Sequence, residues 1–351
     1  MTQTEDMKAI LRRIAEGERL STERAQHAFA LMMAGEATPA QMGAFLMGLR
    51  VRGETVDEIT GGALALRSRA VRVQAPSNAI DTCGTGGDAR GTFNVSTAAA
   101  LVVAGAGVPV AKHGNRALSS RSGSADVLAA LGVNLDADVA LIEEALRIAN
   151  IGFMMAPRHH GATRHVAPAR VELAVRTIFN LLGPLSNPAG AKRQLLGVFS
   201  PQWLEPMAEV ERNLGATRVW VVHGHDGMDE LTTTGPSHVV ELKNGAISRF
   251  TVTPEEVGLA RANLDDLKGA DGEENARHMR ALLDGAPGPL RDIVLLNAAA
   301  ALVIADKAPD LKAGLALAAR SIDTGRARAG LEALITITNR PPPPPEEEVA
   351  S

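Results

Sequence analysis

The feature that most constrains the fold is an alternation of short apolar runs and helical segments that begins near residue 79. Apolar runs at 79–83 and 108–111 are each followed by a glycine-rich loop and then by a helical segment, at 95–106 and 124–131. A third helical segment at 138–150 leads into an apolar run at 151–155. Such alternation predicts a mostly parallel sheet with helices on its faces.

Later segments make the expected sheet mixed. Strands are expected at 194–199 and 218–223, and a hairpin with an Asn244-Gly245 turn is expected to join 237–242 to 246–252. Residues 273–337 indicate further helices, and the alanine-rich run 293–304 is apolar on nearly every side, which predicts burial. We therefore expect an α/β domain over residues 76–340, with a mixed, mostly parallel sheet flanked by helices.

Residues 1–75 predict a small helical domain. Thr38 and Thr55 each precede a glutamine or glutamate by three residues, which is the capping-box pattern of a helix start. These helices are more apolar than a thin layer can hide internally, so we expect one face to meet the larger domain or another subunit. A helix over 165–182 is a candidate addition to this domain. Five prolines and three glutamates at 341–348 predict a disordered tail over residues 341–351.

Composition narrows the class of protein. The chain has 351 residues, 45% of them hydrophobic, and a net charge of −4, so no global positive field attracts nucleic acid or anionic membrane. The N-terminus lacks the order of a secretory signal, and no apolar stretch reaches the roughly 18–20 residues of a spanning helix, so we expect a cytoplasmic protein. Cys83 is the single cysteine, and we interpret it as a small buried residue rather than a nucleophile.

Two glycine-rich loops follow the first two apolar runs, at 81–88 and 112–116. Small residues let main-chain N–H groups approach phosphate oxygens, and the helix opening at 94–97 would direct its positive dipole end toward the same place. Neither the Walker pattern nor Gly-x-Gly-x-x-Gly is present, because Ala89 stands where the third glycine of the latter belongs. The second loop adds Lys112, Asn115 and Arg116, followed by the hydroxyls of Ser119 and Ser120. The pair of loops predicts a polyphosphate site.

Magnesium is the expected companion of a diphosphate, because one lysine cannot neutralise its charge. Asp229 and Glu230 are the candidate ligands, with Ser96 as a further oxygen donor, although adjacent acids in isolation are usually solvated surface. His223 and His225 lack the further ligands of a zinc site.

A basic stretch contains the positions 158–160, 164–165 and Arg170. A guanidinium matches a carboxylate with two parallel hydrogen bonds, so this stretch is a candidate site for a substrate carboxylate. The alternative is a surface face paired with acids such as Glu172.

These motifs, in their order and spacing, resemble the anthranilate phosphoribosyltransferase family of tryptophan biosynthesis. The matching segments are 81–88, 94–97, 112–116, 123–126, Arg170 and 229–230, and the resemblance extends to about residue 339. It implies transfer of phosphoribose from phosphoribosyl diphosphate to the amine of anthranilate, with Mg²⁺, on a fold shared with pyrimidine nucleoside phosphorylases. It also implies a homodimer built through the N-terminal helices.

The resemblance implies the site residues by position. The donor site would comprise Gly84, Gly87, Asp88, Thr92, Asn94, Val95, Ser96, Thr97, Lys112, His113, Gly114, Asn115, Arg116, Ala117, Leu118, Ser119, Ser120 and Ser124. Gly84, Asn115 and Arg170 would contact anthranilate, and Ser96, Asp229 and Glu230 would hold magnesium. Lys112 is expected to stabilise the leaving diphosphate and His113 to orient the acceptor, with no general base assigned.

Two other functions are compatible with such a chain. A pyrimidine nucleoside phosphorylase shares the implied architecture but uses free phosphate, and the second loop and the acidic pair favour a diphosphate donor instead. A non-catalytic relative that binds nucleic acid would need a broad basic surface, which the net charge of −4 does not favour.

Overall fold

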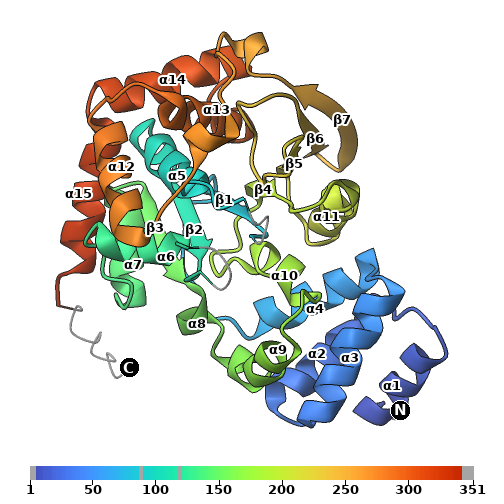
Figure 1. Cartoon of the computed structure of the whole chain (residues 1–351). Helices are drawn as coiled ribbons and strands as arrows, with labels where there is room; N and C mark the ends of the chain where they lie inside the picture. The colour runs from blue at the N-terminus through green and yellow to red at the C-terminus, as the bar shows by residue number, and fades with distance from the viewer. Residues whose placement is uncertain (1–4, 87–89, 118–120, 342–351) are drawn as a thin grey trace.

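The computed structural model describes residues 5–86, 90–117 and 121–341. A helical bundle forms the N-terminal part, shown in blue in Figure 1. Its helices are α1 (Met7–Ala15), α2 (Thr22–Ala34), α3 (Pro39–Arg52) and α4 (Val56–Ser68). In the described part of the chain, no helix has the length and apolar character needed to cross a bilayer.

The two predicted capping boxes are confirmed at the starts of α3 and α4. The Thr38 hydroxyl accepts a hydrogen bond from the N–H of Gln41 at 3.3 Å, and the Gln41 side chain accepts one from the N–H of Thr38 at 2.9 Å. Thr55 and Glu58 make the same reciprocal pair. Each box satisfies two main-chain donors that a helix N-terminus would otherwise leave unpaired.

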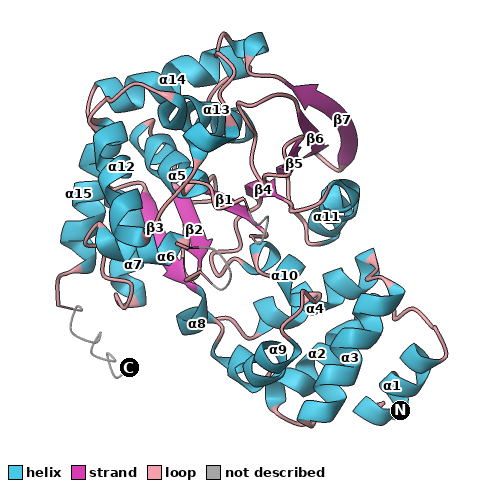
Figure 2. Ribbon diagram, viewed as in Figure 1, coloured by secondary structure: helices cyan, strands magenta, loops and turns pink. Residues whose placement is uncertain are grey.

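The predicted mixed, mostly parallel sheet is confirmed, and Figure 2 shows it in magenta between layers of helices. Its strand order is β3-β2-β1-β4-β5-β6-β7, parallel from β3 to β5 and antiparallel at β6 and β7. The strands are β1 (Ile80–Gly84), β2 (Val110–Gly114), β3 (Ile151–Met155), β4 (Arg193–Gly197), β5 (Arg218–Gly224), β6 (Ser237–Lys243) and β7 (Ala246–Val252). The turn between β6 and β7 has positive φ at both Asn244 and Gly245, as a type I′ hairpin requires.

The sheet separates two apolar cores. Alternate residues of a strand point to opposite faces, and Leu195 and Val222 face one core while Leu196 and Val221 face the other. The first core contains the helices α5 (Val95–Gly105), α6 (Ser124–Ala130), α7 (Val139–Ile148), α12 (Gly272–Leu283), α13 (Pro289–Ile304), α14 (Leu311–Asp323) and α15 (Arg326–Thr338). The second contains α11 (Leu204–Asn213) and continues into the helical bundle, so the bundle packs against the α/β domain.

The expectation of one helix over 165–182 is wrong. The region contains two short helices, α9 (Ala167–Leu173) and α10 (Phe179–Leu182), and it is preceded by α8 (Ala156–His159) and a 3₁₀ turn at Gly161–His165. Helix α9 ends because Ala174 adopts a left-handed conformation, with φ of 51°. Both α9 and α10 pack on the bundle, and the Phe179 ring contacts the edge of Phe29 with centroids 5.5 Å apart.

The two strands that carry the glycine-rich loops share little main-chain pairing although they lie side by side. Strand β1 pairs with β2 only at Ile80 and Val110, whereas it pairs with β4 along its whole length. Beyond that single pair, side chains connect β1 to β2 instead of a main-chain ladder. We call the three buried residues Asp81, Lys112 and Asn187 the polar wedge.

The polar wedge bonds to main-chain groups of β1 and β2 that the short ladder leaves without a strand partner. The amide of Asn187 donates to the Asp81 carboxylate at 2.7 Å and to the carbonyl of Ala111 at 2.8 Å. The Lys112 ammonium donates to the carbonyl of Thr82, and the N–H of His113 donates to Asp81 at 3.3 Å. Burial raises the pKa of Asp81, and the nearby charge of Lys112 opposes that rise.

Replacing Asn187 with leucine tests the polar wedge. The variant leaves a carboxylate oxygen of Asp81 and the carbonyl of Ala111 buried without this donor, so we expect a loss of about 2–4 kcal/mol in the free energy of unfolding. Denaturant titration measures it. The control is Asn213→Ala on exposed surface, for which we expect at most about 0.5 kcal/mol. Equal stability of the two variants would contradict the role of the polar wedge.

Candidate active site

The candidate site lies where the order of the strands reverses. Strand β1 is followed in space by β2 and β3 on one side and by β4 and β5 on the other. In open α/β sheets, ligands bind at the carboxyl ends of the strands where the order reverses in this way, here β1 and β4. Gly84 and Gly197 end these strands and lie opposite each other in the sheet. The segment of Asp229 lies over both, because a Cβ on Gly84 would come within 2.3 Å of Asp229 Oδ2 and one on Gly197 within 1.5 Å of the Asp229 carbonyl oxygen. Only glycine permits this close approach.

The acidic pair meets the first glycine-rich loop and the helix that follows it. Asp229 accepts a hydrogen bond from the N–H of Gly86 at 2.7 Å, and Glu230 accepts one from the N–H of Ser96, in the first turn of α5, at 3.1 Å. The structure therefore brings Ser96, Asp229 and Glu230, the three residues predicted as metal ligands, close together, with Gly84 beside Asp229. These two acids are not an isolated surface pair.

The donor set suits magnesium. Within residues 5–86, 90–117 and 121–341, no three His, Cys, Asp or Glu side chains gather as a complete metal cage. Mg²⁺ commonly takes one or two carboxylates from the protein and its remaining ligands from water and substrate phosphate. Asp229 and Glu230 match this magnesium pattern, because they are two carboxylates that lie beside loop N–H groups suited to a phosphate. His223 Nδ1 instead donates a hydrogen bond to the carbonyl of Val198 at 2.7 Å.

Asn94, after the first loop, bonds to the segment before α6 and to α12. It occupies the N-cap position of α5, but its side chain makes no capping hydrogen bond. Instead its amide donates to the carbonyl of Ser122 at 3.2 Å and its oxygen accepts from Asn275 at 2.9 Å. The N-terminus of α5 is therefore not closed by its own N-cap side chain. Val95 and Thr97 are buried, so their main-chain groups are the parts that can face a ligand at this helix end. The Thr97 hydroxyl is an exception, because it has no hydrogen-bond partner among the described residues.

The second loop differs from the expected cradle of free cations, and it begins later than expected because residues 112–114 belong to strand β2. Lys112 is only 2% exposed and its ammonium contacts Thr82 beneath the loop, so as placed here it presents no charge at the loop surface. Arg116 pairs with Asp126 at 3.1 Å. Burial opposes ionisation of Asp126, but hydrogen bonds from the N–H groups of Ala117 and Gly123 and from Arg116 lower its pKa. The sequence analysis missed this acid as an organiser of the loop, although the motif at 123–126 contains it.

Other predicted positions surround these loops. Asn115 is exposed, its carbonyl accepts from the Ser124 hydroxyl at 3.4 Å, and a Cβ on Gly114 would meet that hydroxyl at 2.2 Å. Thr92 pairs with Lys268 in an isolated bridge. Five of the residues predicted to contact phosphoribosyl diphosphate lie outside the described residues: Gly87, Asp88, Leu118, Ser119 and Ser120.

Two buried histidines meet beside the second loop. His113, on β2, and His160, after α8, have ring centroids 5.2 Å apart. Burial, with the neighbouring His160, lowers the pKa of His113 to about 3, and burial lowers the pKa of His160 to about 4. His113 Nε2 has no hydrogen-bond partner within the described chain, and the main chain of Ser186 lies beside the His160 ring. Both rings are neutral at pH 7, and His113 Nε2 has unused hydrogen-bonding capacity.

The basic stretch is divided among different places. His159 bonds the carbonyl of Val71 at 2.8 Å, whereas Arg158, Arg164 and His165 line a pocket of about 660 Å³ beside the end of α2. Of the residues in this basic stretch, His160 and Arg170 therefore remain as candidates for the substrate-carboxylate site.

Arg170 is a partly buried cation that stacks on an aromatic ring. Its guanidinium stacks on the Phe179 ring, 4.9 Å from the centroid, and burial lowers the pKa of the guanidinium. Among the described residues no carboxylate pairs with it, and Glu172 does not do so. A desolvated guanidinium that lacks a counter-ion is a suitable partner for a substrate carboxylate.

Cys83 has the structural role that the sequence predicted. Its thiol contacts Gln194 and Asp81, and burial raises the pKa of the thiol well above its usual value. The thiolate needed for nucleophilic attack is therefore disfavoured.

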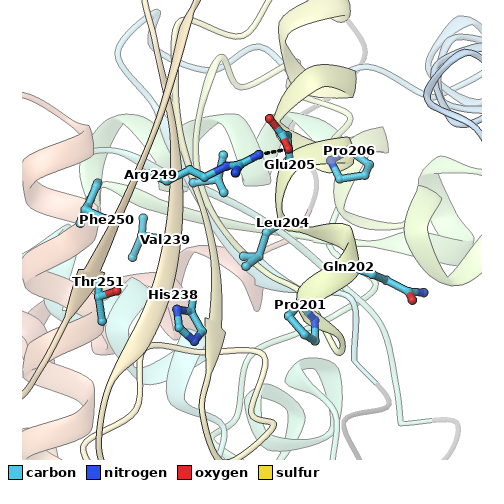
Figure 3. A pocket seen from close by; sticks show the side chains of 11 residues that line it. Pro201, Gln202, Leu204, Glu205, Pro206, His238, Val239, Arg249, Phe250 and Thr251 are labelled. Carbon is cyan, nitrogen blue, oxygen red and sulfur yellow. Dashed lines mark hydrogen bonds and ion pairs between the residues drawn. The ribbon is translucent and has the colours of Figure 1, made fainter.

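A further pocket of about 640 Å³ lies away from these loops, between α11 and the hairpin β6–β7 (Figure 3). Its two charged side chains, Glu205 and Arg249, pair with each other across it. None of the predicted site residues lines this pocket, so it is not the candidate active site.

Comparisons with known proteins give the same architecture over nearly the whole chain. Residues 8–70 match the model of the glycosyl transferase family helical bundle domain, and residues 76–328 match that of the glycosyl transferase family a/b domain. An anthranilate phosphoribosyltransferase of Parvibaculum lavamentivorans is 62% identical over 95% of this chain and 98% of its own.

Solved structures show the same relationship. Anthranilate phosphoribosyltransferase from Thermus thermophilus superposes with a TM-score of 0.90 and 48% identity, over 94% of this chain and 99% of its own. The enzyme of Saccharomyces cerevisiae, in complex with PRPP and Mg, gives a TM-score of 0.88 at 26% identity, over 95% and 99% of the two chains. Sequence and fold agree, and the chain belongs to the anthranilate phosphoribosyltransferase family of glycosyl transferases.

Proposed function

We propose that the chain transfers the 5-phosphoribosyl group of phosphoribosyl diphosphate to the amine of anthranilate, giving N-(5-phosphoribosyl)anthranilate and diphosphate. The observation that carries the proposal is the meeting of Asp229 and Glu230 with Gly86 and Ser96, from more than 130 positions away in the sequence. Main-chain donors and carboxylates together suit a metal diphosphate. The yeast relative, which has the same fold, is in complex with PRPP and Mg.

The donor is proposed to lie across both loops. Main-chain N–H groups of the first loop and of the N-terminus of α5 bind phosphate oxygens, and Thr92 and the residues of the second loop complete the contacts. Lys112 acts from below the loop, where it holds the end of β2 against Thr82 and supplies positive charge near the leaving group. Asp126 keeps the second loop in place through Arg116, Ala117 and Gly123.

Asp229 and Glu230 are proposed to hold magnesium, with Ser96 beside them. The bound ion neutralises the negative charge that develops on diphosphate as the bond to ribose breaks. The two carboxylates must then exchange their present N–H partners, Gly86 and Ser96, for the ion. The same N–H groups are thereby released for phosphate oxygens.

The acceptor is proposed to bind between Arg170 and the histidine pair. The Arg170 guanidinium takes the carboxylate of anthranilate, and Asn115 contacts the same molecule. The neutral rings of His113 and His160 accept a hydrogen bond and orient the amine toward the ribose carbon. An aromatic amine is uncharged at pH 7, so orientation contributes more than proton removal.

The activity assay follows anthranilate fluorescence after mixing with the protein, phosphoribosyl diphosphate and Mg²⁺. We expect conversion that stops when magnesium or donor is omitted. Phosphorolysis of thymidine and uridine, measured in parallel, should be absent. Pyrimidine phosphorolysis without anthranilate turnover would contradict the proposal.

Arg170→Ala tests the carboxylate partner. We expect a loss of about 2–4 kcal/mol in transition-state stabilisation for anthranilate, the scale for truncating one side of a desolvated charged pair. The KM for phosphoribosyl diphosphate should change little, and Arg164→Ala, an exposed arginine of the same stretch, should behave as the unsubstituted protein. An unchanged kcat/KM for anthranilate in Arg170→Ala would show that the arginine does not bind the acceptor.

The pH profile tests the histidine pair. Because the pKa values of His113 and His160 lie at about 3 and 4, both rings stay neutral as pH falls through the ordinary histidine range. We expect kcat/KM for anthranilate to be level from about pH 8 down to about pH 5.5, with no histidine titration near 6.5. A titration near 6.5 that disappears in His113→Asn would contradict the assigned neutral state.

We also propose a homodimer through the helical bundle. Val51 at the end of α3 and Val171 on α9 are 81% and 77% exposed, and α3 packs against α9. Large exposed apolar side chains on neighbouring helices favour an interface between subunits.

Val51→Glu tests this interface. A carboxylate buried at a subunit contact is unfavourable, so we expect the variant to be monomeric by light scattering while the unsubstituted protein is dimeric. Ile148→Glu, at an exposed site on α7 of the other domain, is the control and should stay dimeric. If Val51→Glu is dimeric as well as Ile148→Glu, the subunit interface does not include Val51.

A further inference from the structure

A buried amide on α13 lies directly behind the acidic pair. Asn297 is fully buried within 293–304, a run whose other members are Ile, Val, Leu and Ala. Burying a polar side chain is unfavourable unless hydrogen bonds satisfy it. Its partners therefore explain why this apolar helix contains an asparagine.

The main partner is the main chain of Leu231, the residue after Glu230. Asn297 Oδ1 accepts a hydrogen bond from the N–H of Leu231 at 3.0 Å, and Nδ2 donates to the carbonyl of Leu231 at 2.8 Å. The same Nδ2 donates to the carbonyl of Ile293 at 2.9 Å. The amide thus uses its acceptor and both of its donor hydrogens.

Leu231 depends on this contact because it has no neighbouring strand. It lies in the connection between β5 and β6, outside any ladder, and is fully buried. Asn297 satisfies both of its main-chain groups, as a strand would. Asp226 secures the same connection independently, since it accepts hydrogen bonds from the hydroxyls of Thr232 and Thr234, each at 2.6 Å.

We propose that Asn297 is a positioning residue for magnesium, acting through Leu231 on Glu230. Only one peptide bond separates Glu230 from the held residue, and its Oε1 lies 3.1 Å from the N–H of Ser96 on α5. Helix α13 packs against α5, so the helix that bears the amide also supports the helix that faces Glu230. The inference rests on the proposed function, because it takes Asp229 and Glu230 as the metal ligands.

The test compares Asn297→Leu with a matched control. Leucine keeps the approximate size of the side chain and removes all three hydrogen bonds. The control is Ser321→Ala, which removes another buried hydrogen bond to the main chain, from the serine hydroxyl to the carbonyl of Val102 at 2.7 Å. That bond lies near the C-terminal end of α5, away from Ser96.

Calorimetry then measures binding of Mg²⁺ in the presence of inorganic diphosphate, and thermal unfolding confirms that each variant is folded. We expect Asn297→Leu to weaken magnesium affinity about tenfold or more, the scale for groups that orient metal ligands. The magnesium concentration for half-maximal rate should rise in parallel, with the KM for anthranilate unchanged. Ser321→Ala should lose stability without any change in magnesium affinity.

A second variant covers the case in which Asn297→Leu does not fold. Asn297→Asp keeps the acceptor for the N–H of Leu231 and loses the donor to its carbonyl, so we expect a smaller shift in the same direction. Unchanged magnesium affinity in either folded variant would overturn the inference and leave the proposed function intact. Failure of the unsubstituted protein to bind magnesium with diphosphate would overturn the proposed metal site and the inference together.

Discussion

The contact between β1 and β2 through buried polar side chains is the constraint on which the site depends. After one ladder pair, the two strands are joined by Asp81, Lys112 and Asn187 rather than by a regular main-chain ladder. Charged and polar groups are stable in this interior because each has a partner in the opposite strand or in Asn187. The polar wedge thus holds side by side the two strands that continue into the glycine-rich loops.

The acidic pair completes this space from the other half of the sheet. The connection after β5 crosses the ends of β4 and β1, where Gly197 and Gly84 allow the main chain and carboxylate of Asp229 to approach closely. Asn297 and Asp226 hold that connection in place. In the proposed site, the N–H groups for phosphate come from the loop after β1 and the acids for the metal from the loop after β5, and long-range packing sets their separation.

Local sequence signals predicted much of the fold. The capping residues at Thr38 and Thr55 and the Asn244-Gly245 turn act through neighbours within a few positions, so they can be recognised without tertiary structure. The end of α9 at Ala174 could not be predicted in this way, because alanine favours helix and only the packing of the following segment imposes a positive φ. The candidate site shows the same difference between local signals and long-range contacts. Its glycines and acids were recognisable as motifs, whereas the burial of Lys112, the pairing of Arg116 with Asp126 and the contact of His113 with His160 depend on residues distant in sequence or on loop conformation.

The most direct test of the account is the position of a divalent ion in crystals grown with phosphoribosyl diphosphate and Mn²⁺, located by anomalous scattering. The account predicts a peak at coordination distance, about 2.0–2.2 Å, from carboxylate oxygens of Asp229 or Glu230, with the diphosphate between the loops after β1 and β2. An ion and diphosphate bound elsewhere, with both carboxylates still on the N–H groups of Gly86 and Ser96, would contradict it.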